Sequence, residues 1–292
     1  MDRFKTGSVK ANGIGVSFLE MGEGPLVLCL HGFPDHARSF RHQLPALAGA
    51  GFRAVAPYMR GYAPSDVPPA GPYQAAVLAQ DAVALIRALG YGSATVFGHD
   101  WGAVAAYGAA ITAPERVDRL VAAAVPPGPG IFQAFVANPE QQRRSWYMFF
   151  FQMPFAEDAV AYNDFAFLER IWREWSPGWK YPVGEMESLK ETFRKPGVLA
   201  AALGYYRHTL NPGSQVPALQ DVQRRLFADP VPVPALYLHG ERDGCIGVEL
   251  TEGIEPLFTK GVRKRVIAGA GHFVHQEKPQ EVNRLLLEFL AG

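Results

Sequence analysis

Short apolar runs alternate with longer amphipathic stretches through the first 127 residues of the chain. A continuous apolar run such as Leu26–Leu30 indicates a strand buried on both faces of a parallel sheet, and stretches with apolar positions three or four residues apart indicate crossover helices. The predicted strands are Leu26–Leu30, Phe52–Ala56, Ala94–Phe97 and Leu120–Val125, and the predicted helices are Ser39–Ala50, Gln74–Leu89 and Gly102–Thr112. This order of elements predicts an α/β sheet.

The alternation stops at Pro126–Gly130 and resumes after Pro230–Pro234. Between these proline-rich boundaries the sequence is helical and aromatic, with no β-branched strand run. The later elements are predicted as strands at Ala235–Leu238 and Arg265–Ile267 and helices at Val248–Leu257 and Pro279–Leu290. The sequence therefore predicts a core of residues 1–127 and 230–292 and a helical cap of residues 128–229. Such an insertion lies beside the carboxyl ends of the strands, where open α/β sheets bind ligands.

Aromatic residues are concentrated in the predicted cap. They make up 12% of the chain, and residues 132–181 hold 15 of the 35. An aromatic cap over the strand ends predicts an apolar, water-poor pocket.

Charge narrows the class of protein. The chain has 28 basic and 28 acidic residues. This balance argues against a nucleic-acid partner, which requires clustered Lys and Arg, and it suits an uncharged ligand. No apolar run follows the charged start, and Cys29 and Cys245 can form at most one disulfide, so neither secretion nor a membrane segment is predicted. We expect a cytoplasmic monomer or homodimer.

Metal and cofactor signatures are missing from the sequence. No His or Cys grouping has metal-ligand spacing, and no Gly-rich phosphate loop occurs. We therefore expect neither a metal nor a cofactor.

The segment Gly98-His99-Asp100-Trp101-Gly102 lies between a predicted strand and a predicted helix, which is the context of a nucleophile elbow. Small residues two positions before and after Asp100 allow a tight turn that lifts its side chain above the sheet. A carboxylate is anionic at neutral pH and attacks an electrophilic carbon without a base, so Asp100 excludes the ordinary serine-hydrolase mechanism. The alternative is that Asp100 caps the following helix.

A second turn, His31-Gly32-Phe33-Pro34, follows the strand at 26–30. In such folds this position supplies one backbone N–H of an oxyanion hole, and the residue after the nucleophile supplies the other. The predicted donors are Phe33 and Trp101. The alternative is a simple strand-ending turn.

The acid and the base are predicted in two loops late in the chain. Asp243 and His272 each follow a predicted strand in a Gly-rich loop. The order nucleophile, acid, histidine is that of the α/β-hydrolase fold, so His272 is the predicted base and Asp243 the residue that orients it. Glu241 is the alternative acid, and His275 is the alternative histidine.

These motifs, in this order over almost the whole chain, resemble those of the epoxide hydrolases of the α/β-hydrolase fold. The turn Arg60-Gly61-Tyr62 belongs to the same pattern, and Ala63, where Gly is usual, departs from it. In that family two cap tyrosines bind the epoxide oxygen.

The resemblance implies that these tyrosines are Tyr147, which follows Trp146, and Tyr206. Ring opening leaves an alkoxide, and a phenol can protonate it. Tyr205 competes with its neighbour Tyr206 for this role. The alternative for Tyr147 and Tyr206 is that both rings simply pack in the core of the cap.

The implied activity is hydrolysis of a small apolar epoxide by water to a vicinal diol, through a covalent hydroxyalkyl ester of Asp100. One alternative is a haloalkane dehalogenase with the same Asp-His-Asp triad. Dehalogenases share the tryptophan after the nucleophile, here Trp101, so this residue does not separate the two activities. They also need a second N–H donor for the halide, which the Phe33 side chain lacks but Trp146 or Trp172 offers. Another alternative is a non-catalytic ligand receptor with the α/β-hydrolase fold, which has no need of the triad and both tyrosines together.

Overall fold

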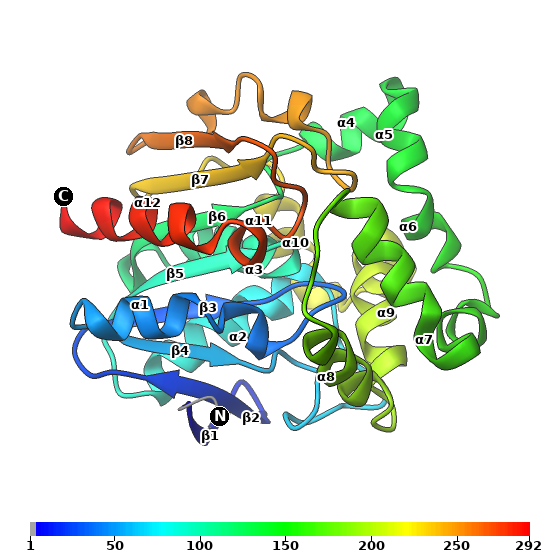
Figure 1. Cartoon of the computed structure of the whole chain (residues 1–292), viewed down its shortest axis with the longest axis horizontal. Helices are drawn as coiled ribbons and strands as arrows, with labels where there is room; N and C mark the ends of the chain where they lie inside the picture. The colour runs from blue at the N-terminus through cyan, green and yellow to red at the C-terminus, as the bar shows by residue number, and fades with distance from the viewer. Residues whose placement is uncertain (1–3) are drawn as a thin grey trace.

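A computed structural model describes residues 4–292 (Figure 1). Within this range, one sheet of eight strands has the order β1-β2-β4-β3-β5-β6-β7-β8. The β1–β2 and β2–β4 pairs are antiparallel, and the other neighbours are parallel. The strands are β1 Lys5–Ala11, β2 Ile14–Met21, β3 Leu26–Leu30, β4 Arg53–Pro57, β5 Ala94–His99, β6 Val117–Ala123, β7 Ala235–Gly240 and β8 Val262–Ile267.

Helices cover both faces of this sheet (Figure 1). They are α1 Gln43–Gly49, α2 Ala75–Ala88, α3 Trp101–Thr112, α11 Val274–Glu277 and α12 Pro279–Ala291. Alternate side chains of β3 reach opposite cores: Leu26 and Leu28 lie in the core with α2 and α3, and Val27 and Cys29 in the core with α1 and α12. Because both faces are covered, β3 is a continuous apolar run.

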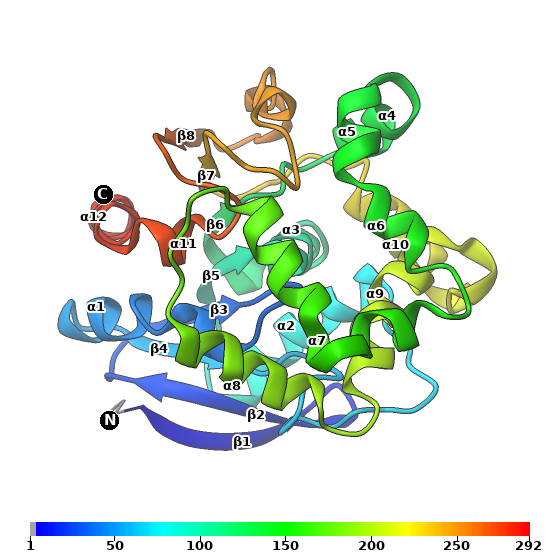
Figure 2. The same ribbon diagram turned by 45° about the vertical axis from the view of Figure 1, so that its right-hand side comes forward.

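The chain between β6 and β7 lies over the carboxyl ends of the parallel strands (Figure 2). Its helices are α4 Gly130–Ala137, α5 Pro139–Arg144, α6 Trp146–Phe150, α7 Ala156–Trp175, α8 Val183–Phe193, α9 Val198–Leu210 and α10 Gln220–Leu226. Helical backbone angles are interrupted inside α7 at Tyr162–Phe165. The division into two domains stays a prediction, and "the cap" below denotes residues 128–229.

The predicted α/β class is confirmed, and each predicted strand overlaps an observed one. The β1–β2 hairpin has no counterpart among the predicted elements, because β1 is largely exposed and polar. The predicted helix over 39–50 is divided into a 3-10 helix, Ala37–Phe40, and α1.

The predicted helix Val248–Leu257 is wrong. Two short 3-10 helices, Val248–Thr251 and Glu255–Leu257, occupy this segment. Gly253 between them has a φ of 69°, which ends the first helix, and Pro256 lacks the N–H that a continuous helix requires. No helix in the described range is long and apolar enough to cross a membrane.

Candidate active site

Asp100 stands in a strained turn between β5 and α3. Its backbone has φ 53° and ψ −119°, a conformation that costs a residue other than Gly about 1–3 kcal/mol. A Cβ at Gly98 would overlap the backbone of Gly102, and a Cβ at Gly102 would overlap the carbonyl of Leu30. The two glycines therefore permit the close approach that the turn requires. The Asp100 side chain makes no capping hydrogen bond to α3, so the helix-cap alternative is wrong.

The turn after β3 places an amide donor against the Asp100 carboxylate. The Phe33 N–H donates to Oδ1 of Asp100 over 2.7 Å, and a Cβ at Gly32 would overlap that same oxygen. His31 holds the turn in place, because its Nε2 accepts from the Met59 N–H over 3.1 Å. The turn at His31–Pro34 therefore contacts the Asp100 carboxylate directly and is not only the end of β3.

Three loops bring Asp100, Asp243 and His272 together as buried neighbours. Nδ1 of His272 lies 2.9 Å from Oδ2 of Asp243, and Nε2 lies 3.6 Å from Oδ2 of Asp100. Oδ1 of Asp243 accepts from the amides of Cys245 and Ile246 over 2.7 and 2.9 Å. The three side chains form one contiguous set at the carboxyl ends of β5, β7 and β8.

The two alternative residues lie elsewhere. Glu241 is exposed, and its Oε2 accepts from the Gly269 N–H over 2.9 Å. His275 belongs to α11 and packs against the ring of His99, with centroids 4.4 Å apart. Neither side chain takes part in the contacts that join the triad.

Charge coupling sets the protonation state of His272. Burial alone would lower the pKa of His272, but the neighbouring carboxylates of Asp243 and Asp100 outweigh burial and raise the pKa to about 10. Burial alone would raise the pKa of Asp243. The positive charge of His272 and the hydrogen bonds that the Asp243 carboxylate accepts outweigh burial and hold this pKa below its ordinary value. At neutral pH the pair is therefore an imidazolium beside a carboxylate.

The end of α7 fastens the loops that carry Asp243 and His272 to the cap. The carbonyl oxygen of Trp175 accepts from the N–H groups of Gly244 and His272, each over 3.0 Å. The hydroxyl of Ser176 accepts from the Phe273 N–H over 3.2 Å. The cap therefore helps to position Asp243 and His272.

The rings of Tyr147 and Tyr206 meet edge to face, with centroids 5.6 Å apart and planes at 87°. The Tyr147 hydroxyl lies 3.3 Å from Sγ of Cys245, and the buried Tyr206 hydroxyl has no hydrogen-bond partner among the described residues. Burial raises the pKa of both phenols well above the ordinary value, so both keep their protons at neutral pH. The Tyr205 hydroxyl donates to the Arg60 carbonyl over 2.6 Å and is engaged outside this pair.

An apolar cavity reaches Asp100. Most of the residues that line it are apolar, as is usual for small-molecule sites. Among the residues that line it are Asp100, Trp101, Val104, Phe132, Met148 and Tyr206. Asp100 and Tyr206 therefore border the same space.

The other two tryptophans considered from the sequence do not line this cavity. Trp146 packs against Phe150 and lies beneath the guanidinium of Arg170, which is 4.9 Å from the Trp146 ring centroid. The indole N–H of Trp172 donates to the Pro34 carbonyl over 2.9 Å. Trp172 is therefore committed to holding the turn after β3.

The model of the alpha/beta hydrolase fold family matches residues 25–279. The chain belongs to this family. It is 33% identical to Epoxide hydrolase 3 of Mus musculus, over 97% of this chain and 75% of that protein. It is 32% identical to Epoxide hydrolase A of Mycobacterium tuberculosis, over 97% of this chain and 96% of that protein.

A crystal structure of the Bacillus megaterium epoxide hydrolase in complex with an inhibitor is similar to this α/β-hydrolase with a TM-score of 0.85. The two chains are 30% identical, and the match covers 98% of this chain and 100% of that one. These comparisons confirm the fold class and the resemblance to epoxide hydrolases predicted from the motifs.

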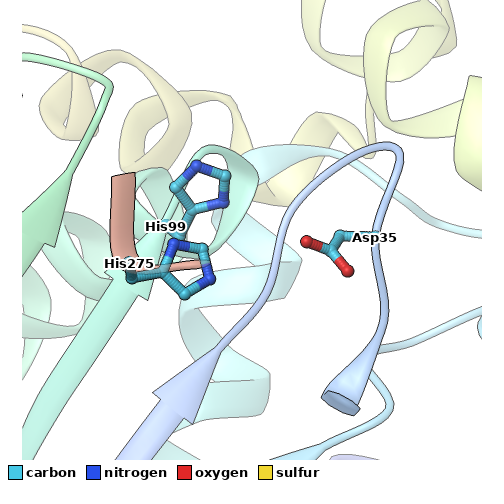
Figure 3. A group of neighbouring side chains, drawn as sticks. All are labelled: Asp35, His99 and His275. Carbon is cyan, nitrogen blue, oxygen red and sulfur yellow. The ribbon is translucent and has the colours of Figure 1, made fainter. Parts of the chain in front are cut away.

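This α/β-hydrolase also buries three neighbouring polar side chains, those of Asp35, His99 and His275 (Figure 3). The two imidazoles and the carboxylate offer donor atoms within 4.8 Å of one another, a set that divalent cations take. Nε2 of His99 lies 2.9 Å from the His272 carbonyl, and Gln276 donates to Asp35 over 2.6 Å. These contacts tie the His272 loop to the end of β5, and α11 to the turn after β3.

Sequence reasoning missed Gln141 of α5. Its amide donates to the Cys245 carbonyl and accepts from the Gly247 N–H, each over 2.9 Å. Gln141 therefore joins the cap to the loop that carries Asp243. It lies in a short polar run with no motif, so no signal in the sequence marks it.

Proposed function

We propose that this α/β-hydrolase is an epoxide hydrolase that converts an apolar epoxide and water to a vicinal diol through a covalent ester of Asp100. The observation that carries the proposal is the pair of buried, protonated tyrosines, Tyr147 and Tyr206, beside an aspartate nucleophile. The His272–Asp243 pair supplies the base for the second half of the reaction.

Ring opening comes first. A carboxylate oxygen of Asp100 attacks one ring carbon while the bond from that carbon to the epoxide oxygen breaks. The oxygen would leave as an alkoxide, and Tyr147 or Tyr206 gives it a proton. The product of this step is a hydroxyalkyl ester of Asp100 beside a tyrosinate.

In the free enzyme the negative charge of Asp100 helps to hold the proton on His272. Ester formation removes that charge. The pKa of His272 then falls, and its proton restores the tyrosinate. The neutral imidazole next deprotonates a water molecule, whose oxygen attacks the carboxyl carbon of Asp100.

The Phe33 N–H and the Trp101 N–H, which lies in the unpaired first turn of α3, stabilise the oxyanion of the resulting tetrahedral intermediate. This intermediate collapses by breaking the bond between the carboxyl carbon and the ester oxygen. The proton of the added hydroxyl passes to that oxygen, so the diol leaves and the Asp100 carboxylate is restored.

A single turnover in heavy-oxygen water tests the covalent step. Because water attacks the carboxyl carbon, the label should enter Asp100 and not the diol. The matched control is Asp100→Ala, which should form no diol. Label in the diol of the first turnover would contradict the covalent ester.

Dehalogenation is the second candidate function. A halide ion needs N–H donors and no proton. Of the indoles considered for that role, Trp172 is committed to Pro34 and Trp146 lies outside the cavity, so the site favours the epoxide. Release of chloride or bromide from a haloalkane, without diol formation from epoxides, would instead favour the dehalogenase. Tight binding of epoxides without turnover would favour the non-catalytic ligand receptor.

A further inference from the structure

One buried side chain of the cap holds the loop after β7 at two points. Gln141 of α5 has no exposed surface. Its amide nitrogen donates to the Cys245 carbonyl, and its amide oxygen accepts from the Gly247 N–H, each over 2.9 Å. Because these contacts lie on either side of Ile246, they fix the backbone from residue 245 to residue 247.

The same stretch of backbone holds the carboxylate of Asp243. The N–H groups of Cys245 and Ile246 both donate to Oδ1 of Asp243, over 2.7 and 2.9 Å. The other oxygen, Oδ2, lies 2.9 Å from Nδ1 of His272. The carboxylate therefore cannot turn relative to the imidazole without a change in its hydrogen bonds to the loop.

These contacts form one hydrogen-bonded path from the cap to the imidazole of His272. A buried carbonyl or N–H group that loses its partner is destabilising, so removal of the Gln141 amide forces the loop to rearrange. Rearrangement of residues 245–247 displaces the two donors to Asp243. Displacement of a catalytic group by about 1 Å can slow a reaction about 100-fold.

We propose that Gln141 is a positioning residue for hydrolysis of the ester, because it holds the loop that orients Asp243. The proposal rests on the proposed epoxide hydrolase function. Hydrolysis requires an imidazole aimed at a water molecule, and Asp243 sets the orientation of His272. Gln141 itself touches neither the substrate nor the reacting atoms.

Ring opening makes a smaller demand on this loop. It uses the Asp100 carboxylate and a proton that Tyr206, which borders the same cavity, can supply. The Tyr147 hydroxyl does contact the loop, at 3.3 Å from Sγ of Cys245. Loss of the Gln141 amide should therefore slow hydrolysis of the ester much more than its formation.

Gln141→Leu tests the proposal, because leucine is of similar size and forms no side-chain hydrogen bond. With styrene oxide as the probe, single-turnover alkylation should stay near the wild-type rate, and hydrolysis of the ester should be about 10- to 100-fold slower. In the steady state kcat should fall while kcat/KM stays nearly unchanged, because kcat/KM reports the steps up to ester formation. Mass spectrometry during turnover should show the ester accumulating.

Hydrogen exchange tests the structural step independently of catalysis. The N–H groups of Cys245, Ile246 and Gly247 are all hydrogen-bonded in the wild-type loop. They should lose their protection in Gln141→Leu, since local opening of the loop exposes them to solvent.

Two neighbouring residues of the cap provide matched controls. The Gln142 amide donates to the Phe135 carbonyl over 2.8 Å, so Gln142→Leu removes a side-chain amide from the same helix. Ser145→Ala removes the remaining contact of the Gln141 amide, a hydrogen bond of 2.7 Å to the Ser145 hydroxyl. Both variants should keep the wild-type rates of both steps and the wild-type exchange. Thermal unfolding verifies that each variant is folded.

Each outcome decides the proposal. Equal slowing of alkylation and hydrolysis in Gln141→Leu would indicate a general structural role and overturn it, and so would unchanged exchange at residues 245–247. Hydrolysis slowed to the same extent in Gln142→Leu would also overturn it. All three results leave the proposed function intact. A wild-type protein that forms no diol from any epoxide would overturn the proposed function and, with it, the role of Gln141 in hydrolysis.

Discussion

Nε2 of His272 lies 3.6 Å from Oδ2 of Asp100, so the proposed base and nucleophile are neighbours without a hydrogen bond between them. At this distance the negative charge of Asp100 stabilises the imidazolium, in addition to the charge of Asp243. The protonation state of His272 therefore depends on the covalent state of Asp100.

Replacement of Asp100 by Ala should lower the pKa of His272. The charge of Asp100 contributes to the raised value of about 10, and its loss leaves burial opposed by Asp243 alone. NMR titration of the imidazole in the wild-type and Asp100→Ala proteins measures the shift. The exposed, distant carboxylate of Glu241 provides a control, because Glu241→Ala should leave the pKa of His272 unchanged. An equal pKa in the wild-type and Asp100→Ala proteins would argue against the coupling.

His272 should also make the folding stability depend on pH. Its pKa in the folded protein, about 10, lies above the ordinary value of 6.5. The contribution of His272 to stability is therefore fully present below about pH 6.5 and is lost as the pH rises through about 10. Urea unfolding of the wild-type and His272→Gln proteins across this range should show a stability difference that shrinks with increasing pH. A difference independent of pH would exclude the predicted linkage.

His272→Gln should trap the covalent ester. The amide keeps much of the shape of the imidazole but cannot take a proton from water, so alkylation proceeds and hydrolysis stops. Mass spectrometry after incubation with an epoxide should show an increase equal to the mass of the substrate. Asp100→Ala treated in the same way should show none, and a His272→Gln protein without the adduct would remove His272 from the hydrolytic step.

Tyr206→Phe and Tyr205→Phe form a matched pair with opposite expectations. Loss of the Tyr206 hydroxyl should slow alkylation about 100-fold, the lower range for a general acid. Loss of the Tyr205 hydroxyl removes its hydrogen bond to the Arg60 carbonyl, which should cost about 1 kcal/mol of stability and leave kcat nearly unchanged. Single-turnover kinetics and urea unfolding measure the two effects. The reverse result would exchange the roles of the two tyrosines.

Gly32→Ala should abolish most of the activity. The added Cβ would overlap Oδ1 of Asp100, so the carboxylate or the turn must move away from its position. Gly49→Ala is the control, because a Cβ there meets nothing within 4 Å, and this variant should keep the wild-type activity. Diol formation by both variants, measured at equal folded concentration, tests the steric argument. Full activity in Gly32→Ala would show that the contact is dispensable.

Local sequence determines the parts of the fold and site that could be predicted. Leu26–Leu30 is apolar throughout because both faces of β3 are covered, and Gly98–Gly102 holds the nucleophile and the glycines of its turn within five consecutive residues. Such features depend on neighbours in the chain. The parallel strands of the sheet and the tight turn around Asp100 therefore followed from pattern alone.

Long-range packing determines the parts that could not be predicted. Asp35, His99 and His275 come from three separate segments, and Gln141 contacts a loop more than 100 positions away. The choice between Tyr205 and Tyr206 depends on which hydroxyl reaches the Arg60 carbonyl, a contact made across 145 positions. These relationships exist only once the chain has folded.

One backbone carbonyl of the cap, that of Trp175, accepts from the amides of Gly244 and His272, in the loops that carry the proposed acid and base. A chimaera that takes its cap from a relative would replace this acceptor, and both loops would lose an anchor at the same time. We expect such hybrids to retain turnover only when the incoming cap ends its long helix with the same backbone geometry. Recombination between relatives should therefore transmit residues 175 and 176 together with the loops that they hold.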